Sequence, residues 1–320
     1  MSKFLIFILI LTSLVSHLNV SPCGSTPSSP IVIDSDDDFV TYGFRGKGLK
    51  EDPYVIEGLD IESKGSMSNG IEIKGTHAYF IIRKCEIRAE YIGILVKNVS
   101  PGTATIERNV LIGSSNNGGG IVLESNSVQV RGNNCTGFID GIHTNYADDC
   151  YFVGNNLNGN EYHGLSLRFS NNNQVVNNTI TGNKGYGLFI IRSSRGNYVY
   201  NNTFIDNAIR ESYDWDDLYH FVLSSQALDE GSSNVWFNEE DKLGNLWSDY
   251  DSSGVYKIDG SANSVDKYPT KVGGSQDVVP KPIDDNSNQG IPGFPFESMI
   301  LAIFVVLGYL VHVRSSYRVQ

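Results

Sequence analysis

A repeat of about 23 residues runs through the middle of the chain and constrains its fold more than any other feature. A glycine followed by an aliphatic residue recurs six times, and a second column, mostly asparagine, keeps register with it. The glycines are Gly70, Gly93, Gly120, Gly141, Gly164 and Gly187. The second column holds Cys85, Asn109, Asn133, Asn155, Asn178 and Asn202, each with an apolar residue three positions before it and two after it.

The repeat predicts a parallel β-helix. Asparagine and glycine are poor helix formers, which argues against a helical solenoid, and the Leu-x-x-Leu-x-Leu pattern of leucine-rich repeats is missing. Apolar residues alternate after most glycines, as in Ile71 and Ile73, which is the pattern of a strand with one inward face. We therefore expect an all-β solenoid over residues 70–209, with about six to seven coils in total and the asparagines stacked as an internal ladder.

These repeats resemble the right-handed parallel β-helix repeats of the NosD-like family, which is related to carbohydrate-binding and sugar-hydrolase domains. Two flanking motifs carry the resemblance further: Glu-Asp-Pro-Tyr-Val-Ile-Glu-Gly at 51–58 and Gly-Asn-Leu-Trp-Ser-Asp-Tyr at 244–250, followed by Tyr268-Pro269. The similarity covers roughly residues 30–270. It implies a right-handed solenoid, with an N-terminal cap and opening strands at 23–69 and an irregular last coil and closing segment at 210–270.

Both ends of the chain are apolar and predict an exported, anchored protein. Residues 1–22 have the charged start and apolar run of a signal peptide. A Pro-rich linker at 271–293 leads to an apolar segment at 294–313, long enough for a transmembrane helix, and to an arginine-bearing tail at 314–320. The arginines place the tail in the cytoplasm and the β-helix outside, as a single-pass protein of the cell membrane. A buried helix at either end is the alternative.

The C-terminal pattern also resembles the sorting tails of archaeal surface proteins, in which case the anchor is processed. The sequons at Asn98, Asn134, Asn177 and Asn201 would be N-glycosylation acceptors where they face outward. The chain carries 24 basic and 36 acidic residues, a net charge of −12, so we expect no nucleic-acid partner.

Metal chemistry finds little support in the sequence. Founding members of the NosD-like family assist copper maturation of nitrous oxide reductase, but Met, Cys and His are not clustered here, which disfavours such a role. Relatives often carry a denser Asp/Gly cluster in the closing segment, which implies Ca²⁺ as the alternative cofactor. The acids in that segment are Asp249, Asp251, Asp259 and Asp266. The cysteines of the repeats are expected to be buried single thiols.

One constellation predicts a site. Asp140 should lie one coil from His163, with Tyr186 one coil further. Asp140 and His163 are the catalytic candidates. The ligand-binding candidates are His143, Asn145, Arg168 and Tyr186, a mixture suited to an acidic sugar. An incidental Asp–His pair on a solvated surface is the alternative.

No outward column stacks two carboxylates on neighbouring coils, as a β-helix glycosidase would require. The sequence therefore favours a cell-surface protein that binds extracellular carbohydrate without catalysis. The alternatives are a polysaccharide lyase or glycoside hydrolase, and a structural or adhesive surface element.

Overall fold

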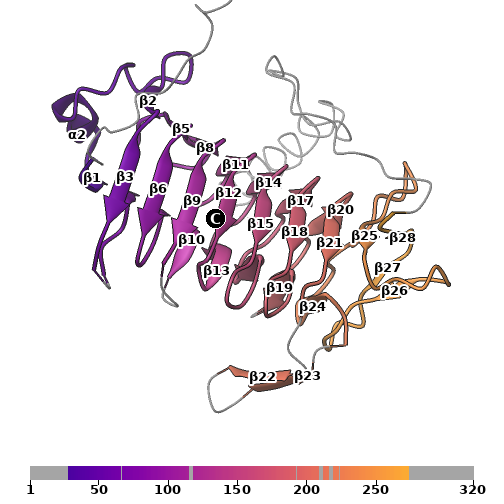
Figure 1. Ribbon diagram of the computed structural model, residues 1–320. Coiled ribbons are helices and arrows are strands. Elements are labelled where there is room, and N and C mark those ends of the chain that lie inside the picture. Colours follow the sequence, from indigo (N-terminus) through magenta and orange to yellow (C-terminus); the bar gives the residue numbers. More distant parts are fainter. Residues whose placement is uncertain are drawn as a thin grey trace, which may run out of the picture. The chain divides into compact units, whose positions relative to one another are not determined.

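The computed structural model describes residues 28–273, apart from positions 66, 115–117, 192, 209–211, 216–218 and 223. This part of the chain winds into a stack of parallel coils (Figure 1). The predicted signal peptide, transmembrane segment, tail and most of the linker lie outside the described residues. Within the described ranges, no helix has the length and apolar character needed to cross a membrane.

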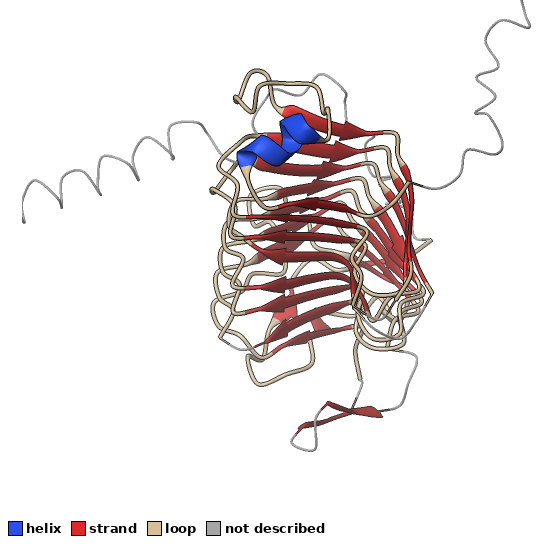
Figure 2. Cartoon of the chain, turned by 90° about the vertical axis from the view of Figure 1, so that its left-hand side faces the viewer, coloured by secondary structure: helices blue, strands red, loops and turns tan. Residues whose placement is uncertain are grey.

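Three parallel sheets form the walls of the stack, and Figure 2 shows their strands side by side. The first sheet contains β1 (Ile31–Ile33), β4 (Ile71–Lys74), β7 (Ile94–Lys97), β10 (Gly119–Glu124), β13 (Asp140–Asn145), β16 (Leu165–Arg168), β19 (Leu188–Ile191) and β24 (Ala227–Asp229). The second contains β2 (Tyr54–Glu57), β5 (Phe80–Arg83), β8 (Ala104–Glu107), β11 (Gln129–Arg131), β14 (Tyr151–Val153), β17 (Gln174–Val176) and β20 (Tyr198–Tyr200). The third contains β3 (Asp60–Ser63), β6 (Glu86–Ala89), β9 (Val110–Gly113), β12 (Asn134–Thr136), β15 (Asn156–Asn158), β18 (Thr179–Thr181), β21 (Thr203–Ile205), β25 (Leu246–Trp247) and β28 (Thr270–Lys271).

Several short elements lie outside the three sheets. Two antiparallel pairs follow the repeats, β22 (Ser212–Trp215) with β23 (Tyr219–Val222) and β26 (Tyr256–Lys257) with β27 (Val265–Asp266). The helix α2 (Asp36–Thr41) packs against the first coil (Figure 2). Its Phe39 stacks on Tyr54 with the ring centroids 4.7 Å apart, so an apolar ring covers the N-terminal end of the core.

The stack has about eight turns, and the prediction of six to seven coils was too low. The six coils expected over residues 70–209 are present, and the first sheet has one strand before them and one after. β1 pairs in register with β4, Ile31 opposite Ile71, and β3 pairs with β6, Ile61 opposite Ile87. The opening strands lack the glycine and asparagine columns, so the repeat pattern in the sequence did not count them as a coil.

The recurring glycines are explained by the close approach of neighbouring coils before the first sheet. A Cβ atom on Gly141 would lie 2.7 Å from the carbonyl oxygen of Gly164, and one on Gly93 would lie 2.5 Å from that of Gly120. The alternating residues that follow point into the core, where Ile71 and Ile73 are fully buried. Each such side chain contributes roughly 1.5–3 kcal/mol of hydrophobic stabilisation.

The predicted asparagine ladder is present. From Asn109 to Asn202, each Nδ2 donates to the Oδ1 of the asparagine in the next coil at 2.9–3.1 Å. The same Oδ1 accepts the backbone N–H of the preceding asparagine, and the second Nδ2 hydrogen goes to a core-strand carbonyl such as Val130 O at 3.0 Å. Every polar atom of the buried amide is therefore satisfied within the stack. The ladder continues to Asn245, at 3.0 Å from Asn202 Nδ2, which the sequence analysis placed only in the closing motif.

Two further ladders lie at the other bends and were not predicted. One contains Asn160, Asn183, Asn207 and Gln226, and the other contains Asn173, Asn197 and Asn234. As in the first ladder, one amide hydrogen of each asparagine is donated to the next coil toward the C-terminal end, and the other can go to a carbonyl of the preceding coil, as from Asn183 Nδ2 to Leu157 O at 3.1 Å.

Each of the three ladders ends on a carboxylate. Asp266 accepts from Asn245 Nδ2 at 3.2 Å, Asp249 from Gln226 Nε2 at 2.7 Å, and Asp229 from Asn234 Nδ2 at 2.8 Å. Asp266 and Asp229 also accept the indole N–H groups of Trp247 and Trp236, at 2.9 and 3.1 Å. The two buried tryptophans that close the core are thus tied to the ladder ends.

The three cysteines within the described residues are buried free thiols, as predicted. Cys85 lies in the column of the ladder that begins at Asn109, and its backbone N–H donates to Asn109. Cys150 lies in the column of the ladder that begins at Asn173, and its backbone N–H donates to Asn173. Cys135 fills an apolar core position. Burial raises the pKa of the Cys150 thiol to about 12, so this thiol stays protonated at neutral pH.

Replacement of one ladder residue should destabilise the whole stack. Asn155→Leu removes the acceptor of two hydrogen bonds donated by Asn133 and leaves Asn178 Oδ1 with fewer donors. We expect a loss of ~1–3 kcal/mol in the free energy of unfolding, measured by chemical denaturation. Asn158→Leu is the matched control, because Asn158 is only partly buried and bonds Asn134 at the surface. Equal losses of stability in the two variants would show that the buried ladder contributes no more to stability than a hydrogen bond at the surface.

Candidate functional site

The predicted site lies where three successive coils enter the first sheet. Asp140 begins β13, while His163 and Tyr186 stand just before β16 and β19. Asp140 Oδ1 accepts the backbone N–H of His163 at 3.2 Å, and His163 Nδ1 accepts that of Tyr186 at 3.1 Å. The structure therefore brings these three residues together in the order along the stack that the repeat indicated.

Two outward residues of the first sheet converge on the same carboxylate. His143 Nδ1 lies 3.0 Å from Asp140 Oδ2, and Arg168 Nη2 lies 3.5 Å from that oxygen. Arg168 also donates from Nε to Ser166 Oγ at 3.1 Å. Asn145 is the cross-strand neighbour of Arg168 in the sheet.

Burial divides the six predicted residues into two groups. Asp140 and His163 are each 2% exposed and Tyr186 is fully buried, whereas the side chains of His143 and Arg168 retain 22% and 19% exposure. Tyr186 donates its hydroxyl to Asp259 Oδ2 at 3.1 Å, so its polar end points to the closing segment. The predicted contact of Tyr186 with a ligand and the predicted catalytic use of Asp140 and His163 do not agree with this burial. His143, Asn145 and Arg168 remain as the accessible polar residues of the predicted site.

The charges inside the cluster are balanced. Burial favours the protonated form of Asp140, but the hydrogen bond with His143 and the positive charge of Arg168 outweigh it and lower the pKa of this carboxyl. Burial lowers the pKa of His163 to about 4, so its ring is neutral at neutral pH. The ring stacks on Phe189 with the centroids 4.0 Å apart. An ionised carboxylate and a neutral imidazole are therefore locked into the wall of the solenoid.

Two aromatic residues continue this surface and were missed by the sequence analysis. Tyr146 follows Asn145 and Phe169 follows Arg168, and their rings stack at 4.7 Å with an angle of 4° between the planes. Tyr146 is 64% exposed. The signal in the sequence is an aromatic residue directly after the strand in two consecutive repeats.

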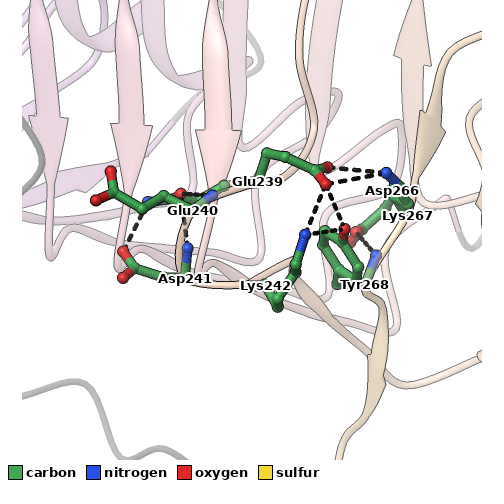
Figure 3. Close-up of polar contacts among 8 residues, drawn as sticks. Glu239, Glu240, Asp241, Lys242, Asp266, Lys267 and Tyr268 are labelled. Atoms are coloured by element: carbon green, nitrogen blue, oxygen red, sulfur yellow. Dashed lines mark hydrogen bonds and ion pairs between the residues drawn. The ribbon is translucent and has the colours of Figure 1, made fainter.

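A second polar cluster lies at the closing segment (Figure 3). Glu239 accepts from Lys242 at 2.7 Å, Lys267 at 2.9 Å and the Tyr268 hydroxyl at 2.8 Å, and these bonds lower its pKa to about 2. Beside it, a pocket of about 200 Å³ is lined by Lys242, Tyr268 and residues near Asn201 and Thr270. Because the charged side chains are about half exposed and are paired with one another, this arrangement is a surface network.

The residues present do not fit the calcium alternative. Asp266 and Asp249 end amide ladders, and Asp259 accepts from Tyr186 and from Ser225 N–H at 3.1 Å. No group of three or more His, Cys, Asp or Glu side chains that could hold a metal occurs in the described part of the chain.

A comparison with protein families finds a match to a right-handed β-helix region over residues 54–218. The chain belongs to the right-handed β-helix family. A search of curated proteins gives no match. Among solved structures, the A-module of the mannuronan C-5 epimerase AlgE6 of Azotobacter vinelandii is similar to this right-handed β-helix, at 17% sequence identity and a TM-score of 0.35. The match covers 66% of this chain and 69% of that one.

The buried His163 should make the β-helix less stable at mildly acidic pH. Its pKa is about 4 in the folded chain and ~6.5 when unfolded, so the folded state favours the neutral ring. This stabilisation is complete above pH ~6.5 and is lost as the pH falls toward 4, at a slope of at most about 1.4 kcal/mol per pH unit. Denaturation curves between pH 6.5 and 4.5 should show a smaller slope for His163→Gln. A wild-type slope in His163→Gln would contradict the assignment.

Proposed function

We propose that this right-handed β-helix binds extracellular carbohydrate without catalysis, through the surface formed by His143, Asn145 and Arg168. The observation that carries the proposal is the division of the polar cluster by burial. His143 and Arg168, which can contact a ligand, remain partly exposed, while the predicted catalytic pair Asp140 and His163 is 2% exposed.

Arg168 is the residue best suited to an acidic sugar. Its planar guanidinium donates in a fork that matches a carboxylate, and its Nε bond to Ser166 limits the freedom of the side chain. Asn145 and His143 add amide and imidazole groups on the neighbouring strand, which suit the hydroxyls of a sugar. A parallel sheet repeats such positions at ~4.8 Å, a geometry that fits an extended polymer.

A glycoside hydrolase is less well supported by this geometry. Glycosidases place two carboxyl groups about 5–9.5 Å apart on either side of the bond that they cleave. The carboxylate of this cluster, Asp140, already accepts from the His163 backbone and contacts His143 and Arg168. Such a group stabilises the sheet in its ionised form and has little capacity left for a substrate.

The proposal includes display on the outer face of the cell membrane. The apolar ends of the sequence and the arginines at 314 and 318 support a cleaved signal and a single-pass anchor, retained or processed. The net charge of −12 disfavours a nucleic acid as the partner. The resemblance to NosD-like repeats supports a carbohydrate-related role and does not by itself support copper handling.

Arg168→Ala should weaken the binding of an acidic oligosaccharide. With oligogalacturonate in calorimetric titration, we expect a loss of ~1.5–3 kcal/mol, the range for a hydrogen bond to a charged group. The methyl-esterified oligomer lacks the carboxylates, so its affinity should change little. The melting temperature should fall slightly, because Arg168 also balances Asp140.

Two variants serve as controls for this experiment. Arg168→Lys keeps the positive charge beside Asp140 but lacks the fork, so it should recover stability more fully than binding. Lys97→Ala removes a cation at the same strand position nearer the N-terminus, where it pairs with Glu124 at 2.6 Å, and should leave binding unchanged. Equal losses from Lys97→Ala and Arg168→Ala would point to general electrostatics instead of a site. Absence of wild-type binding across a broad panel of glycans would favour the structural or adhesive role.

The proposed orientation in the membrane has its own measurement. Protease added to intact cells should release a soluble fragment that ends in the 271–293 linker, since this Pro-rich segment follows the last described strand. Mass spectrometry of the released fragment would locate the cleavage. Protection of the whole chain would contradict the outward orientation.

A further inference from the structure

The chain leaves several strands of the first sheet through a residue in the left-handed conformation. These residues are Gly75, Asn98, Tyr146 and Phe169, with φ between 48° and 67°. Glycine and asparagine adopt this conformation readily, whereas bulky aromatic residues rarely do. Two adjacent coils nevertheless place a tyrosine and a phenylalanine there, which marks the position as a place where ring side chains have a use beyond the turn itself.

The coil between Asn98 and Tyr146 lacks a residue at this position. Glu124 is the cross-strand partner of Lys97, and the next residue, Ser125, accepts the N–H of Val99 through its hydroxyl at 3.1 Å. In the later coils Ser170 makes the same contact with Ala147 N–H, at 3.2 Å, but Ser170 comes one residue after the left-handed Phe169. The coil of β10 is therefore one residue shorter at this bend.

The vacant position faces the ring of Tyr146. Phe169, one coil toward the C-terminus, covers one face of Tyr146 at 4.7 Å, and the other face points toward the shortened coil. This agrees with the 64% exposure of Tyr146. Because coils are ~4.8 Å apart, Asn98 stands two spacings from Tyr146, and a flat ring between them would continue the stack at nearly the same spacing.

We infer that this vacant position is a subsite for one pyranose ring of a bound glycan. A pyranose presents a C–H face, which packs on an aromatic ring. The subsite rests on the proposed carbohydrate-binding function and extends it. Asn145 and Arg168 directly precede the two rings, so the polar surface and the ring stack form one continuous strip.

Tyr146→Asn tests the subsite without disturbing the turn. Asparagine accepts the left-handed conformation, as Asn98 does in the same column, so the melting temperature should stay within a few degrees of wild type. We expect the full chain to lose about tenfold in affinity for both oligogalacturonate and its methyl ester, because stacking does not depend on the carboxylate. Tyr146→Phe keeps the ring and should keep most of the affinity. Tyr198→Ala removes a 44% exposed tyrosine from the second sheet and should change nothing.

A second variant approaches the subsite from the other side. Insertion of one phenylalanine between Glu124 and Ser125 restores the length of the short bend and should place a ring of the protein itself in the vacant position. We expect the insertion to lower affinity for both oligomers while the fold is maintained, as judged by circular dichroism.

The outcomes separate this inference from the proposed function. If the wild type binds and Tyr146→Asn binds equally well, the subsite is wrong while the surface around Arg168 stands. If Tyr146→Asn weakens only the acidic oligomer, its effect depends on the carboxylates of the ligand and the stacking role is wrong. If the wild type binds neither oligomer, carbohydrate binding of this kind and the subsite fall together.

Discussion

The rest of the structure depends on the direction of the buried amide hydrogen bonds. Each asparagine in a ladder accepts from the coil before it and donates to the coil after it, so one chain of hydrogen bonds runs from Asn109 to Asn245. An unpaired amide in this position would lower the free energy of unfolding by roughly 1–3 kcal/mol. The requirement fixes the side chain at each bend, and through it the register of the strands on either side. The glycine contacts and the apolar columns then follow from how closely the coils lie.

Much of this architecture could be predicted because a solenoid repeats local information. The columns of Gly70 and Asn109 recur at nearly constant spacing, and four columns in register leave few alternatives to a parallel β-helix. The two additional ladders were equally visible in principle, since Asn160, Asn183 and Asn207 recur at steps of 23 and 24. The carboxylates that end these two ladders were not visible, because Asp249 and Asp229 reach them from segments that break the period.

The site was predicted less well for the same physical reason. The repeat correctly placed Asp140 beside His163, since neighbouring coils determine that contact. It could not show that Tyr186 would be covered, because the partner of its hydroxyl is Asp259, 73 residues further along the chain. The stacked Tyr146 and Phe169 were missed because their exposure depends on a left-handed backbone and on a bend that is one residue short in the preceding coil. Accessibility at a solenoid surface is thus set by the exceptions to the repeat.

The carboxylates at the ladder ends also bear on how the molecule meets other copies of itself. The last coil of a parallel solenoid exposes strand edges and would offer amide donors on which another chain could add further coils. Here the terminal donors are already taken by Asp229, Asp249 and Asp266, and the tryptophan rings cover the core beside two of them. A carboxylate has no hydrogen to donate onward, so the hydrogen-bonded chain stops there. The same groups that complete the fold therefore act against end-to-end polymerisation into fibres.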